Sequence, residues 1–142
     1  MRYYKTSDGD KLLIAFDRGD LVLEGLREVA KAEGIAAAAI ISGIGTLDRC
    51  QIHWVGGTGL PPKNEFATFE GPLEVASFQG TVIGGVPHVH VCFSDLTRTY
   101  AGHLEDGSRV CYRAEICLQL LPGLDLTTRR HPETNLPQIV PR

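Results

Sequence analysis

Apolar residues recur at helical spacing in only one stretch of the chain, between residues 21 and 33. The positions three or four apart that share a face are Val22, Leu26, Val29 and Ala30. Asp20 is a favourable N-cap for a helix here, and Gly34 can end it, because glycine readily adopts the left-handed conformation found after helices. The pattern therefore predicts one amphipathic helix through Glu33.

The remaining apolar pattern predicts strands. Segments with alternating or continuous apolar residues cover 11–16, 35–47, 49–55, 73–83, 86–94, 98–104 and 109–120. The alanine-rich segment 35–47 is compatible with a helix, but its short length between glycines and its Ile-Ile end favour a buried strand. Within it, the glycines of residues 42–45 indicate a tight turn. One helix among many strands predicts an α+β fold with a mostly antiparallel sheet and the helix packed on it.

The segment 98–120 has the pattern of a β-hairpin. In 109–120 the even-numbered residues, from Val110 and Tyr112 onward, form the predicted core face. Asp106-Gly107 favours a two-residue turn, which would pair His103 with Val110. Paired residues share a face, so His103 is expected on the same side as Val110 and Tyr112. A bulge would shift this register.

The C-terminal segment differs in composition from the rest of the chain. Residues 121–142 contain four prolines and no sustained periodicity, which indicates an extended arm or loose tail. The sequence thus predicts a folded domain over residues 1–120 and a separate C-terminal segment over 121–142.

Composition excludes some classes of protein. With 142 residues the chain has the size of one domain, and no apolar run reaches the ~18 residues of a membrane span. There are 14 basic and 17 acidic side chains, a net charge of −3, which argues against a broad basic surface for phosphates. The four cysteines form no C-x-x-C pair, and the N-terminus has no apolar signal segment, so we expect a cytoplasmic protein.

Three histidines form the strongest chemical pattern. His88 and His90 are two residues apart in a predicted strand, so both side chains lie on one face, opposite Val89, Val91 and Phe93. His103 lies on a strand that can be the neighbour. Three imidazoles without a carboxylate suit Zn²⁺ or a similar divalent transition metal and leave an outer position for water or another ligand.

The other polar residues give no comparable pattern. His53 and His131 have no partner at a suggestive spacing, so we expect structural or solvent-facing roles for them. Asp95, Glu74 and Glu115 are candidates for a general base near the histidines, but the spacing selects none of them, and no catalytic residue is identified.

Together these motifs resemble the plants-and-prokaryotes conserved (PPC) domain, described as a DNA-binding-like domain. The resemblance spans residues 9–120 and is carried by GDLVLEGLREVAKAEGI, ISGIGTL, FEGPLEVASFQGTV, PHVHVCFSD, YAGHLEDGSRV and AEICL. It implies an α+β fold with an antiparallel sheet and a homotrimer. It also implies that His88, His90 and His103 are candidate metal ligands.

The chain departs from the plant members in the features tied to DNA. Plant relatives carry a basic AT-hook for the minor groove, whereas this chain has no R-G-R-P segment. The segment tied to partner contacts in plants is matched by Gly71, Leu73, Glu74, Val75 and Ser77, with Pro72 in place of an arginine. Ala101 stands before Gly102, where the family often has glycine.

Two main functions follow from the sequence. The first is a homotrimeric, metal-binding (zinc) PPC module with a role in DNA binding or regulation, in which trimerisation would assemble any positive surface for DNA or a protein partner. The second is a metal-dependent enzyme of unknown substrate that uses the three-histidine site. A small cupin-like barrel is a further form of the enzyme hypothesis, although Ser94-Asp95 stands where cupins usually supply a glutamate.

Overall fold

The computed structural model describes residues 1–142 and contains nine strands and one helix. The helix α1 spans Val22–Ala32. The strands are β1 (Arg2–Lys5), β2 (Lys11–Asp17), β3 (Ala37–Val55), β4 (Asn64–Ile83), β5 (Val86–Ser94), β6 (Thr99–Leu104), β7 (Arg109–Leu120), β8 (Leu126–Arg130) and β9 (Pro137–Pro141). No helix is long and apolar enough to cross a membrane.

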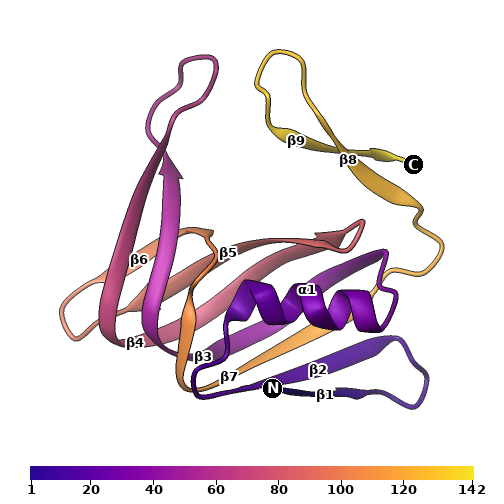
Figure 1. Ribbon diagram of the computed structural model, residues 1–142, viewed down its shortest axis with the longest axis horizontal. Helices are drawn as coiled ribbons and strands as arrows, with labels where there is room; N and C mark the ends of the chain where they lie inside the picture. Colours follow the sequence, from indigo (N-terminus) through magenta and orange to yellow (C-terminus); the bar gives the residue numbers. More distant parts are fainter.

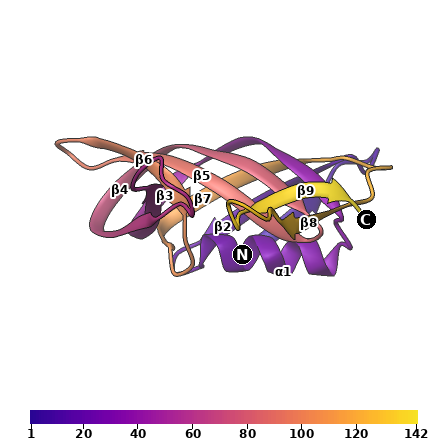
Figure 2. The ribbon, with the colours of Figure 1, turned by 90° about the horizontal axis from the view of Figure 1, so that it is seen from above.

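Seven strands form one antiparallel sheet in the order β1-β2-β7-β3-β4-β5-β6. The end of β3 also pairs with β6, so that β3, β4, β5 and β6 form a closed circuit of strands. Figures 1 and 2 show α1 lying along one side of this sheet. The predicted α+β fold with a mostly antiparallel sheet is therefore confirmed.

The helix packs its apolar stripe on the sheet. Leu26 and Val29 are fully buried in one cluster with strand residues such as Phe16 and Ile116. Burial of each such side chain contributes about 1.5–3 kcal/mol relative to exposure. Gly25 permits close contact, because a Cβ atom there would lie 2.6 Å from Cε1 of Phe16. The spacing of apolar residues in the sequence thus predicts which side of α1 packs on the core.

The sequence predicts the C-terminal end of α1 correctly but not its N-cap. Gly34 has a φ of +62°, and Ile35 N donates to Ala30 O, as in a glycine-terminated helix. At the other end the predicted N-cap is wrong: Leu21 is the N-cap and makes no side-chain capping bond. The Asp20 carboxylate instead accepts from Asp17 N at 2.7 Å and pairs with the N-terminal ammonium of Met1 at 2.9 Å.

The segments 35–47 and 49–55 form one long strand, β3, and not two. A register irregularity between Leu47 and Arg49 marks the point where the sequence pattern breaks. The predicted tight turn at residues 42–45 is wrong, because these residues lie inside β3. Their glycines serve packing: a Cβ on Gly45 would lie 2.5 Å from Cβ of Ala114 on the neighbouring β7.

The predicted hairpin between 98–104 and 109–120 is also wrong. β6 pairs with β5 and β3, and β7 pairs with β2 and β3, so His103 does not face Val110. The backbone of the turn binds Gln51 of β3 instead: Glu105 N donates a hydrogen bond to Gln51 O at 2.8 Å. The two strands therefore separate and follow different parts of β3.

The prediction that Tyr112 belongs to the core face is wrong. Val110 is fully buried, whereas Tyr112 is 69% exposed. Between the pairs Leu47–Val110 and Gly45–Ala114, β7 has two more residues than β3. This irregularity interrupts the alternation of β7 at Tyr112.

The C-terminal segment forms a β-hairpin of its own. β8 and β9 pair with each other and with no strand of the main sheet, and Figure 1 shows them at one end of the molecule. A short loop at Leu121 precedes this hairpin. The separation of residues 1–120 from 121–142 stays a prediction.

Candidate functional site

The three predicted histidines lie on one face of the sheet. In β5, Val89 and Val91 are buried in the core, so His88 and His90 point to the opposite face, where both are exposed. His103 of β6 pairs directly with His90 and therefore shares that face. We call this side of the sheet, turned away from the hydrophobic core, the outer face.

The three imidazole rings are nearly equidistant. Ring centroids are 5.0 Å apart for His88 and His103, 5.4 Å for His90 and His103, and 5.4 Å for His88 and His90. A tetrahedral ion bound about 2.0–2.1 Å from one nitrogen of each ring places ring centroids about 5 Å apart. The spacing of the rings is thus compatible with one shared ion.

A fourth histidine, His53, belongs to the same group, contrary to the expectation that it has no partner. His53 of β3 pairs directly with His103, and their rings stack at 4.4 Å with an interplanar angle of 27°. Phe66 of β4, 69% exposed, lies 5.3 Å from the His53 ring on its other flank. The alternation of β3 places His53 opposite the buried Ile52, but no local pattern reveals that β3 pairs with β6.

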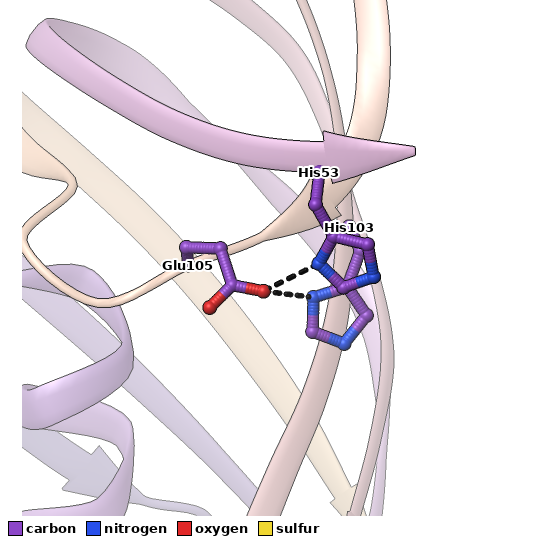
Figure 3. Close-up of side chains that lie close together, drawn as sticks. All are labelled: His53, His103 and Glu105. Carbon is purple, nitrogen blue, oxygen red and sulfur yellow. Dashed lines mark hydrogen bonds and ion pairs between the residues drawn. The ribbon is translucent and has the colours of Figure 1, made fainter. Parts of the chain in front are cut away.

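Glu105 joins two of these rings. Its Oε1 lies 2.5 Å from Nδ1 of His53 and 3.2 Å from Nδ1 of His103 (Figure 3). The second contact lacks hydrogen-bond geometry, so Nδ1 of His103 is buried without a hydrogen bond. A carboxylate at Nδ1 leaves Nε2 of the ring free for a metal and sets the orientation of the ring.

Glu105 was not among the predicted acidic residues, although it stands two residues after His103 and so has the same strand parity. Two of the three predicted candidates have other contacts. The Asp95 carboxylate accepts from the backbone of Thr97 and Arg98, and hydrogen bonds, first that from the Thr97 hydroxyl, lower its pKa to about 2. Glu115 lies on β7, 3.9 Å from Arg113, and Glu74 is exposed on β4.

The surroundings of His103 and His90 favour the neutral form of these two imidazoles. Burial, and next the neighbouring His53, lowers the pKa of His103. Partial burial, and next His88, lowers the pKa of His90. Neutral imidazole is the form that binds a metal ion, so these rings are prepared for coordination near neutral pH.

Two sets of residues come into question for a metal. The three predicted histidines are grouped by their ring centroids but do not bring three ligand atoms within 4.8 Å of one another, whereas in the second set His53, His103 and Glu105 each offer one ligand atom within 4.8 Å of the others. In the second set, however, Oε1 of Glu105 is only 2.5 Å from Nδ1 of His53. Two ligands of one tetrahedral ion lie about 3.3 Å apart, so this contact is better described as a hydrogen bond. The geometry therefore favours Glu105 as a group that orients the rings of His53 and His103.

The fold and the site define an α+β protein with a polyhistidine cluster on the exposed face of an antiparallel sheet. The family model of the Plants and Prokaryotes Conserved (PCC) domain, abbreviated PPC above, matches residues 3–122. The chain belongs to this family, as its motifs predict. No curated protein matches the sequence.

Solved structures of similar fold include three from prokaryotes. A PPC protein from Pyrococcus horikoshii is 28% identical with a TM-score of 0.72, and the match covers 93% of this chain and 87% of that one. A protein from Ralstonia eutropha, described as one proposed to bind DNA, is 25% identical with a TM-score of 0.81, over 97% and 94%. A metal-containing protein from Archaeoglobus fulgidus is 24% identical with a TM-score of 0.81, over 93% and 94%, and shows the shared fold alone.

Proposed function

We propose that this protein binds one divalent transition metal ion, zinc or a similar ion, through His88, His90 and His103. The observation that carries the proposal is the nearly equal spacing of the three rings, 5.0 to 5.4 Å between centroids, on one face of two paired strands. The metal-containing relative from Archaeoglobus fulgidus supports it.

The residues around the rings fit such an ion. Glu105 lies at Nδ1 of His103, which keeps Nε2 available, and His53 stacks on the same ring and shares the carboxylate. Bound there, the ion would supply Lewis acidity and a fourth coordination position open to water or a ligand. The chain itself supplies the ring orientation through Glu105 and the rigidity of paired strands.

Metal analysis of protein purified without a histidine tag tests the proposal. We expect about one zinc per chain after reconstitution, and loss of that zinc in His90→Ala. His131→Ala is the matched control, because the His131 ring lies in the C-terminal segment, where Nδ1 accepts from Glu133 N at 3.3 Å. Equal zinc content in the wild type and in His90→Ala would contradict the proposal.

We also propose a wider role for the metal-binding protein. It is a cytoplasmic homotrimer, and it binds DNA or has a regulatory function. The Ralstonia eutropha relative supports DNA binding, whereas the net charge of −3 gives no electrostatic support. Exposed apolar side chains on β2, β3 and β7, including Leu13, Ile44 and Tyr112, favour self-association. The four free cysteines suit a reducing cytoplasm.

Two measurements separate these parts of the proposal. Light scattering should give the mass of three chains; a monomer mass would reject the trimer. Binding to duplex DNA should be detectable at about 50 mM salt, where phosphate contacts are strongest. No binding at that salt concentration would remove DNA as the partner and leave the metal-binding role.

The alternative function is a metal-dependent enzyme of unknown substrate. It is favoured by the exposure of His88 and His90, which gives access to an outer coordination position, and by a carboxylate beside the cluster. In the Co²⁺-substituted protein, an open position predicts a change of the visible absorption spectrum on addition of azide. A spectrum that azide leaves unchanged would indicate a closed site and argue against catalysis.

A further inference from the structure

The contacts of the Glu105 carboxylate with His53 and His103 require that the backbone of Glu105 is held in position. Glu105 follows the last residue of β6 and begins a turn, so strand pairing does not hold it on both sides. A shift of this backbone would move Oε1 away from the rings of His53 and His103 together. The groups that hold the turn therefore control how the two rings are oriented.

Ser108 connects this turn to β3. Its Oγ accepts a hydrogen bond from Gln51 N at 3.0 Å and donates to Glu105 O at 2.9 Å. Glu105 N in turn donates to Gln51 O at 2.8 Å. Ser108 is fully buried and is the one polar residue in the buried set. Its hydroxyl thus links a backbone group of β3 to one of the turn.

Helix α1 holds the same turn from the other side. Gly107 N donates to Oε1 of Glu24 at 2.8 Å, and Val22 N donates to Ser108 O at 3.0 Å. Arg27 forms an ion pair with Asp106. The turn is therefore fixed between β3 and the first two turns of α1, although the rings that it serves lie on the outer face.

We propose that Ser108 is a positioning residue: through Glu105 O and Gln51 N it fixes the Glu105 carboxylate against Nδ1 of His53 and of His103. The consequence is that the His53 ring, which hydrogen-bonds Oε1 through Nδ1, carries its proton there and exposes Nε2. The same negative charge 3.2 Å from Nδ1 of His103 favours that tautomer in the second ring. The part of this inference that concerns metal affinity rests on the proposed zinc site. The part that concerns the ring tautomers does not.

Long-range ¹H–¹⁵N NMR of the imidazole nitrogens in metal-free protein tests the inference. In the wild type, His53 and His103 should show the Nδ1–H tautomer. In Ser108→Ala this tautomer should lose population, and Glu105→Ala, which removes the acceptor itself, should give the largest loss. Ser108→Thr keeps the hydroxyl and should restore the wild-type spectrum even if the added methyl group lowers stability.

Leu12→Ala separates positioning from general destabilisation. Leu12 is fully buried on β2, which pairs with β1 and β7 and not with β6. It should lower stability and leave the tautomers unchanged. Wild-type tautomers in Ser108→Ala, or an equal loss in Leu12→Ala, would overturn the inference. If Ser108→Ala does not fold, Glu24→Gln, which weakens the bond from Gly107 N, replaces it with the same expected direction.

A zinc titration of the same variants completes the test. Loss of an orienting partner lowers metal affinity about 10-fold to 100-fold, and we expect Ser108→Ala near the lower end, at about 10-fold. A tautomer change in a protein that binds no zinc would reject the proposed function and leave the positioning role of Ser108 intact. A wild-type zinc affinity in Ser108→Ala together with wild-type tautomers would reject the positioning role alone.

Discussion

Replacement of Glu105 distinguishes an orienting carboxylate from a metal ligand. One oxygen, Oε1, lies at 2.5 Å from Nδ1 of His53 and at 3.2 Å from Nδ1 of His103. In Glu105→Gln an amide oxygen can still accept in the same place, but the charge that roughly doubles the strength of such a bond is lost. We therefore expect zinc affinity to fall about 10-fold, which is about 1.4 kcal/mol of binding free energy.

In Glu105→Ala the acceptor itself is removed, and the loss should approach 100-fold, or about 2.7 kcal/mol. Competition with a chromogenic chelator at constant pH and salt measures both values. Glu115→Gln is the matched control, because Glu115 lies on β7 beside Arg113 and should leave zinc affinity unchanged. Unchanged affinity in both Glu105 variants would refute the orienting role. Complete loss of the stoichiometric ion would instead make Glu105 a ligand.

Three further predictions concern the fold around the site. Leu104 is fully buried next to His103 in β6. Leu104→Ala should lower the free energy of unfolding, measured by urea titration, by about 2–5 kcal/mol. A loss below about 1 kcal/mol would contradict the place of Leu104 in the core. Burial raises the pKa of the Cys50 thiol to about 12, so the thiol stays protonated at pH 8. A thiol reagent should therefore modify Cys50 only after unfolding. Rapid reaction of all four cysteines in the native protein would contradict this. A chain that ends at Leu121 should still unfold cooperatively and bind zinc, since β8 and β9 pair only with each other; an unfolded product would place the domain boundary later.

The helix and several strands could be predicted because their patterns are local. The stripe that includes Leu26 and Val29 marks α1, and Gly34 marks its end at a φ of +62°. The N-cap could not be predicted in the same way, since Asp20 is a good capping residue by type. Its carboxylate pairs with the N-terminus instead, a contact set by where β1 lies beside β2.

The error at the Asp106-Gly107 turn has a similar cause. The dipeptide favours a two-residue hairpin, and Gly107 does adopt a positive φ of +81°. The neighbouring backbone groups, however, bond to Gln51 of β3 and to Glu24 of α1. Those partners are distant in the sequence, so turn chemistry alone could not show that they would displace the pairing of β6 with β7.

The sequence by itself determined that His88 and His90 share a face, because successive strand residues alternate sides whatever the strand pairs with. It also determined the family, through motifs spread over most of the chain. Only the tertiary structure decided that His103 lies opposite His90, that His53 stacks on it, and that Glu105 serves both rings. Those contacts depend on which strands pair with β3. The paired residues of β3 and β6 are about fifty positions apart in the sequence, so no local pattern shows that they meet.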